Sequence, residues 1–123
     1  MIAIAISLML AATEGPPPYP QALQCAGLTM AWSDLEAENK AAGAALARSD
    51  AEFWAFATMD AARRAGGLKP PQVEAGMTHT TQAARARFQA GDANAARELL
   101  DCQIMIPEEG RRTAPVGEPP KPS

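Results

Sequence analysis

The sequence predicts an all-α protein, a small three- or four-helix up-and-down bundle with one disulfide joining its first and last helices. Three observations lead to this prediction. Apolar residues recur at helical spacing through most of residues 21–106, the predicted bundle domain. Turn signals divide that region, and patterns typical of β-strands are nearly missing from it. The chain also holds two cysteines, Cys25 and Cys102, one near each end of the helical region.

Length and charge limit the classes of protein to consider. A chain of 123 residues has room for one domain with a modest core. Alanine is the commonest residue and arginine outnumbers lysine eight to three, which is typical of GC-rich bacterial genomes. The net charge is −3 and the charges are dispersed, so we expect no nucleic-acid partner.

Residues 1–15 are predicted to be a signal peptide. An uncharged apolar run extends from Ile2 to Ala12, which is too short to cross a bilayer but has the length of a signal-peptide core. Small residues follow, so cleavage after Thr13 or Gly15 fits. No Lys or Arg precedes the run, and a buried core helix or a short membrane anchor therefore remain alternatives. Export would place the chain in the periplasm or outside the cell, with no stable membrane insertion after cleavage.

Two proline-rich segments flank the predicted bundle. Residues 16–20 are expected to form an extended spacer, because proline fixes φ and removes a hydrogen-bond donor. Residues 107–123 contain five prolines, two glycines and few residues that a core would bury. We therefore expect a disordered tail there.

The first helix is predicted to begin near Gln21 and to continue to about Ala47. The segment SDLE offers Ser33 as an N-cap with Glu36 at capping-box spacing, so a bend at Ser33 is left open. Six residues of this helix recur on one predicted apolar stripe: Cys25, Leu28, Trp32, Leu35, Ala42 and Leu46.

The second helix is predicted to open at Ser49, with Glu52 completing a capping box. Arg63 and Arg64 in its last turn suit the helix dipole, and a Gly-Gly pair stops it. Its apolar face is broad and includes Phe53, Trp54, Phe56 and Ala57.

The last two helices follow clear boundary signals. The third comes after KPP, since proline is tolerated in a first turn. Gly91 is predicted to end it and Asp92 to cap the fourth, which Pro107 terminates. One side of the third helix carries Val73, Met77, Thr80, Ala84 and Phe88. One side of the fourth carries Ala95, Leu99, Cys102 and Ile106.

Both cysteines lie in these apolar stripes, so both thiols are predicted to face the same core. If the first and last helices are neighbours, the two sulfurs can bond, and an oxidising compartment would preserve that bond. Two separate buried thiols and an intermolecular disulfide are the alternatives.

The apolar leader together with CAGL, the GD turn and LLDC resembles the small, secreted, alanine-rich helical proteins of proteobacteria that carry a single disulfide. The resemblance implies export and a helical fold, and it brings no activity with it.

Catalytic and metal-binding signals are sparse, so we expect neither a cofactor nor a metal. His79 is the single histidine, and no motif of a hydrolase, a nucleotide-binding loop or a zinc protease accompanies it. A small enzyme using His79, or a periplasmic copper-binding protein using Met77 and His79, are the rival hypotheses.

The leading hypothesis is a non-catalytic binding or interaction module of the bacterial envelope. Its partner would be a protein or a small apolar ligand held between the helices, where bundles usually place such sites. Four aromatic residues are the candidate ligand contacts: Trp32, Trp54, Phe56 and Phe88. As plain core residues, which is the preferred interpretation, all four need no ligand at all.

Overall fold

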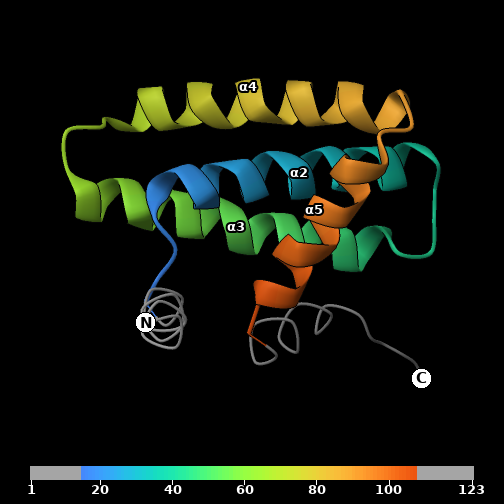
Figure 1. Cartoon of the computed structure of the whole chain (residues 1–123), viewed down its shortest axis with the longest axis horizontal. Coiled ribbons are helices and arrows are strands. Elements are labelled where there is room, and N and C mark those ends of the chain that lie inside the picture. Colours follow the sequence, from blue (N-terminus) through green and yellow to red (C-terminus); the bar gives the residue numbers. More distant parts are fainter. Residues whose placement is uncertain (1–14, 108–123) are drawn as a thin grey trace, which may run out of the picture.

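The structure is a computed structural model that describes residues 15–107, and these residues form a helical bundle (Figure 1). Four helices follow in order: α2 (Tyr19–Glu38), α3 (Ala44–Ala65), α4 (Pro70–Gln89) and α5 (Ala93–Met105). The described chain contains no strand. The predicted all-α class is confirmed. Apart from Gly15 and Pro107, the predicted signal peptide and tail lie outside the described residues.

The helix α2 is the centre of the bundle, because most of the contacts between helices involve it. The helices α2, α3 and α4 run antiparallel in chain order, with α3 and α4 on opposite sides of α2 (Figure 1). The shorter helix α5 crosses α2 and α3 obliquely rather than running parallel to them (Figure 1). The arrangement is thus three up-and-down helices with a fourth laid across one face.

Small residues on α2 let the helices approach closely. Ala22, Ala26 and Ala31 are fully buried in the central core. A Cβ atom added to Gly27 would lie 2.6 Å from backbone and side-chain atoms of Thr80, so α2 and α4 are in backbone contact at this point. The Thr80 hydroxyl donates a hydrogen bond to the Leu23 carbonyl oxygen beside it.

The predicted single helix from Gln21 to about Ala47 is wrong. The helix α2 passes straight through Ser33 and ends at Glu38, where Lys40 adopts a positive φ of 52°. The Lys40 and Ala41 amides donate to the Ala37 and Glu36 carbonyls, which is the hydrogen-bond pattern of a Schellman helix end.

Two further boundaries also differ from prediction. The helix α3 begins at Ala44 with Gly43 as its N-cap, so Ser49 lies within the helix and caps nothing. Leu46, expected on the first apolar stripe, is 41% exposed on α3. Tyr19 and Pro20, assigned to the spacer, form the first turn of α2, since a proline at this position interrupts no helical hydrogen bond.

The remaining boundaries are confirmed. The helix α3 stops at Gly66, and α4 starts directly after Lys69. Gly91 has a φ of 75°, and the Asp92 side chain accepts a hydrogen bond from the Asn94 amide at 2.9 Å, as expected for an N-cap. The predicted face of α5 is buried throughout, with Ala95, Leu99, Cys102 and Ile106 at 7% exposure or less.

Candidate functional site

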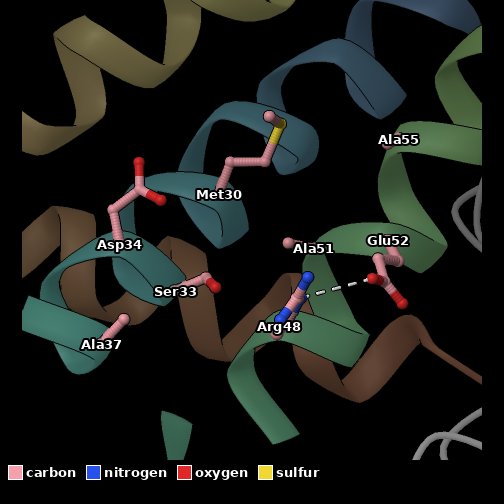
Figure 2. Close-up of a pocket in the computed structure, with 8 residues that line it drawn as sticks. All are labelled: Met30, Ser33, Asp34, Ala37, Arg48, Ala51, Glu52 and Ala55. Atoms are coloured by element: carbon pink, nitrogen blue, oxygen red, sulfur yellow. Dashed lines mark ion pairs between the residues drawn. The ribbon is translucent and has the colours of Figure 1, made fainter. Parts of the chain in front are cut away.

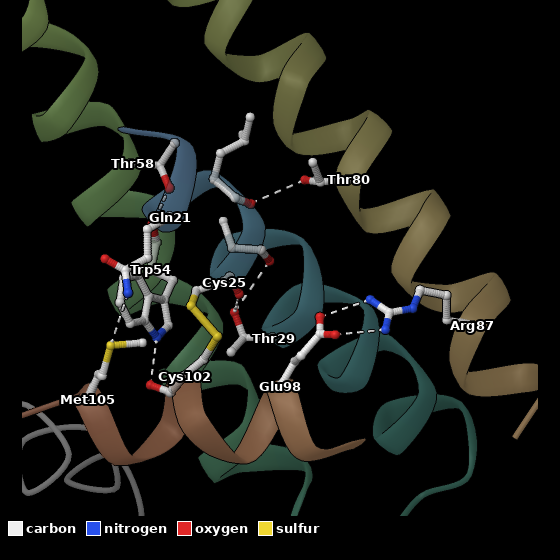
Figure 3. The surroundings of a disulfide bond; sticks show 12 residues. Gln21, Cys25, Thr29, Trp54, Thr58, Thr80, Arg87, Glu98, Cys102 and Met105 are labelled. Carbon is white, nitrogen blue, oxygen red and sulfur yellow. Dashed lines mark hydrogen bonds and ion pairs between the residues drawn. A yellow bond between two sulfur atoms is a disulfide. The ribbon is translucent and has the colours of Figure 1, made fainter. Parts of the chain in front are cut away.

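The predicted disulfide is present and links α2 to α5 (Figure 3). The Cα atoms of Cys25 and Cys102 are 5.6 Å apart, and each residue is 3% exposed. Both partners lie in the bundle core, so bulk water and large reductants have little access to the sulfurs. The bond therefore acts as a covalent tie that holds α5 against the three long helices.

Polar groups around the disulfide are satisfied within the chain (Figure 3). The indole N–H of Trp54 donates to the Cys102 carbonyl oxygen at 3.1 Å, and the Thr29 hydroxyl donates to the Cys25 carbonyl at 2.7 Å. Trp54 is only 1% exposed. A buried indole that already has its acceptor is a core residue linking α3 to α5.

The other three aromatic candidates do not share a site with Trp54. Trp32 and Phe88 pack edge-to-face at 5.5 Å between α2 and α4, both half-buried. Phe56 is 71% exposed, so its expected position inside the bundle is wrong. Residues two apart on a helix differ by about 200° in direction, so the burial of Trp54 turns Phe56 outward. None of the four aromatic residues lines either of the two hollows described below.

An open groove of about 380 Å³ lies instead between α2 and α3 (Figure 2). It sits on the opposite face of these helices from α5, which passes behind them in Figure 2. Residues from the second half of α2 and the first half of α3 line it: Met30, Ser33, Asp34, Ala37, Arg48, Ala51, Glu52 and Ala55.

Small side chains create this groove. Ser33 and Ala37 are four residues apart on α2, and Ala51 and Ala55 are four apart on α3, so each pair forms a short row on its helix. At this place the short side chains of the two rows leave the space between α2 and α3 unfilled. Met30 closes the inner end, where its sulfur accepts a hydrogen bond from Thr81 of α4 at 3.8 Å.

The rim of the groove is charged. Arg48 and Glu52 form an ion pair of 3.6 Å, with side chains 78% and 62% exposed, and Asp34 extends from α2 on the other side (Figure 2). An ion pair this exposed contributes little to stability, so both groups can turn toward a ligand. The groove thus combines an apolar base with one cation and two carboxylates at its edge.

A second hollow of about 260 Å³ lies where α3 turns into α4. Apolar groups dominate its lining, which comprises Met59, Ala62, Arg63, Leu68, Pro70 and Val73. Met59 is 41% and Leu68 37% exposed. This hollow is smaller than the groove and has a single charged group, Arg63, at its edge.

Two arginines of α4, Arg85 and Arg87, form ion pairs with acids of the chain itself. Arg87 of α4 donates to Asp92 at 2.9 Å and to both carboxylate oxygens of Glu98 at 3.0 Å (Figure 3 draws the Glu98 pair). These hydrogen bonds hold the pKa values of both carboxyls below their ordinary range and raise the pKa of Arg87. Arg85 binds Glu38 at 2.6 Å and holds its pKa low, chiefly through that hydrogen bond.

Met77 and His79 point in different directions from α4. Met77 is 8% exposed and packs into the core, whereas His79 is exposed to solvent. Within residues 15–107, no three His, Cys, Asp or Glu side chains gather into a metal-binding group. Met77 and His79 therefore do not form a joint site in this structure.

The groove residues were not among the sequence candidates, which were chosen for aromatic character. The sequence did contain a pattern that indicates the groove, because Ser33/Ala37 and Ala51/Ala55 are pairs of small residues at i, i+4 spacing. The groove could not be predicted from this pattern without the turn at Asn39–Gly43, because only that turn places the two rows of small residues face to face. With one continuous helix to Ala47, the rows could not have met.

Comparison with protein-family models, with curated proteins and with solved structures found no match. None of the helices described here is both long enough and apolar enough to cross a membrane.

Proposed function

We propose that this protein is a small exported helical module that acts by non-catalytic binding in the periplasm or outside the cell. Two features support export. The apolar run from Ile2 to Ala12 has the length of a signal-peptide core. The Cys25–Cys102 disulfide is of the kind that persists in oxidising compartments and is rare in the cytosol.

The groove between α2 and α3 is the observation that supports binding. Its volume of about 380 Å³ falls within the range of about 300–1,000 Å³ common for small-molecule sites. Met30, Ala51 and Ala55 offer an apolar base, and the opposite charges of Asp34 and Arg48 lie at its edge. A small, largely apolar molecule with one polar end fits this chemistry.

Binding is tested with N-phenyl-1-naphthylamine, a neutral apolar dye that fluoresces when it leaves water. The purified, oxidised full chain should give a saturable increase in fluorescence. Ala37→Leu and Ala55→Leu place larger side chains in the groove and should abolish that increase. Ala83→Leu is the matched control, since Ala83 is exposed on α4 away from the groove. Equal dye binding by all four proteins would contradict the groove as the site.

Export is tested by native and denaturing mass spectrometry of the protein purified from the envelope fraction of its host. The expected mass lacks the leader and two hydrogens, and a ligand carried through purification would appear in the native spectrum. A chain that retains its leader and two alkylatable thiols would contradict export.

A further inference from the structure

An exposed stripe on the outer side of α3 has an unusual composition. Glu52, Phe56, Met59 and Arg63 follow one another at intervals of four, three and four residues, which is the spacing of a coiled-coil seam. Phe56 is 71% and Met59 41% exposed, while the side chains of Glu52 and Arg63 are 62% and 76% exposed. The stripe therefore has two large apolar side chains at its centre and opposite charges at its ends.

The stripe is complementary to itself. Positions 52 and 63 lie equally far from its midpoint, and so do positions 56 and 59. When a second copy of α3 is laid antiparallel about a two-fold axis through that midpoint, Glu52 faces Arg63 of the second copy. Phe56 then faces Met59 of the second copy, and every contact occurs twice, as in any isologous interface.

We propose that the α3 stripe is the interface of an antiparallel homodimer. The central contacts pair an aromatic ring with a thioether sulfur, a combination that is attractive beyond its apolar area. The outer contacts pair a carboxylate with a guanidinium in both halves. A parallel arrangement would place Glu52 against Glu52 and Arg63 against Arg63, so the charges select the antiparallel orientation.

The ion pairs already present within α3 leave this interface accessible. Glu52 forms an ion pair with Arg48 at 3.6 Å, and because both side chains are highly exposed, this pair holds Glu52 only weakly. Arg63 pairs with Asp60 at 2.6 Å, but Asp60 also binds Arg64 at 2.9 Å. Arg63 can thus turn to a second copy while Asp60 keeps a partner.

The expected dimer is small and reversible. Residues 52–63 span about 16 Å of helix, so the interface is at the low end of the sizes of specific complexes. Glu52 also belongs to the rim of the α2–α3 groove, and dimerisation would bring Arg63 of the second copy to that rim. The proposal does not depend on ligand binding or on export, and its test reports only self-association.

Self-association is measured by sedimentation velocity on the oxidised full chain over a concentration series that extends to the millimolar range. The wild-type chain should shift from monomer to dimer with rising concentration. Phe56→Asp should remain monomeric throughout. Ile104→Asp on α5 is the matched control, because Ile104 is also 71% exposed, and this variant should dimerise like the wild type. A monomeric wild type, or dimers that Ile104→Asp abolishes and Phe56→Asp does not, would overturn the proposal.

Charge exchange gives a second test with no change at the apolar centre. Glu52→Arg alone and Arg63→Glu alone place like charges together twice and should each weaken dimerisation at least about tenfold. Mixing these two variants restores opposite charges at both ends, so a heterodimer should form that neither variant can form with itself. Circular dichroism checks that both remain helical. A mixture that stays monomeric while the wild type dimerises would rule out the antiparallel pairing.

Discussion

Loss of the disulfide should remove a large part of the stability of this fold. The perturbation is the double variant Cys25→Ala/Cys102→Ala, compared with the oxidised wild type. The bond closes a loop of 77 residues. On the chain-entropy model, a loop of that length constrains the unfolded state enough to contribute about 4.5 kcal/mol at 25 °C.

This contribution can be compared with the total stability. Domains of this size have a free energy of unfolding of about 5–15 kcal/mol, so the bond supplies roughly a third or more. The entropy of unfolding near the midpoint is about 2.1 cal/mol/K per residue, or about 0.19 kcal/mol/K for a body of some 90 residues. The melting temperature should therefore fall by about 24 °C in the double variant.

Urea and thermal unfolding followed by circular dichroism measure this effect. The wild type reduced with a phosphine and the double variant should behave alike, because both lack the cross-link and differ little in packing. The oxidised chain should also have a smaller m-value, since its cross-linked unfolded state exposes less surface. Equal midpoints for the oxidised and reduced chains would refute the reasoning, because α5 would then be held by packing alone.

Three further outcomes follow from individual contacts. Gly27→Ala should lower the free energy of unfolding by about 1–3 kcal/mol, because its Cβ would overlap the backbone of α4. Gly76→Ala is its control and should be neutral or stabilising, since the nearest atoms lie 3.4 Å away on side chains, and urea titration measures both. Trp54→Phe leaves a buried carbonyl of α5 without its donor and should cost about 1–3 kcal/mol in the same assay. The pKa of Glu98 is lowered in the fold, chiefly by its hydrogen bond from Arg87. The stabilisation from that bond is therefore complete above the ordinary pKa of 4.5, and it is lost as the pH falls through the lower pKa of the folded state. Arg87→Met should therefore reduce stability at pH 7 and flatten its decrease in acid, and an unchanged urea midpoint at pH 7 would contradict this role.

The two Schellman helix ends show how far local sequence can predict this fold. At the end of α4 the residue with the left-handed conformation is a glycine, Gly91, and the end of this helix was predicted from it. At Lys40 the same hydrogen-bond pattern uses a lysine, whose Cβ makes this conformation unfavourable in isolation. Propensity therefore favoured a helix that continued to Ala47, and packing of α3 back along α2 overrode it.

The disulfide was predictable for a related reason. Cys25 and Cys102 each fell in an apolar stripe at helical spacing, and that spacing alone oriented both thiols toward a core. The aromatic candidates were less predictable, because Trp54 and Phe56 both looked suited to an interior. Only one of two residues that point about 200° apart can face the core, and the sequence did not indicate which.

By itself, the sequence determined the helical class and the limits of α4 and α5, and it predicted that Cys25 and Cys102 would meet if the first and last helices were neighbours. Periodicity, caps and stop residues act over a few positions, so they can be interpreted without knowledge of the fold. The groove at Met30 and Ala51, the exposure of Phe56 and the oblique path of α5 were decided only by the tertiary structure. The groove depends on where the chain turns after Glu38, the exposure of Phe56 on the burial of Trp54, and the path of α5 on its packing against helices that come earlier in the sequence. Packing between residues far apart in the sequence decides all three.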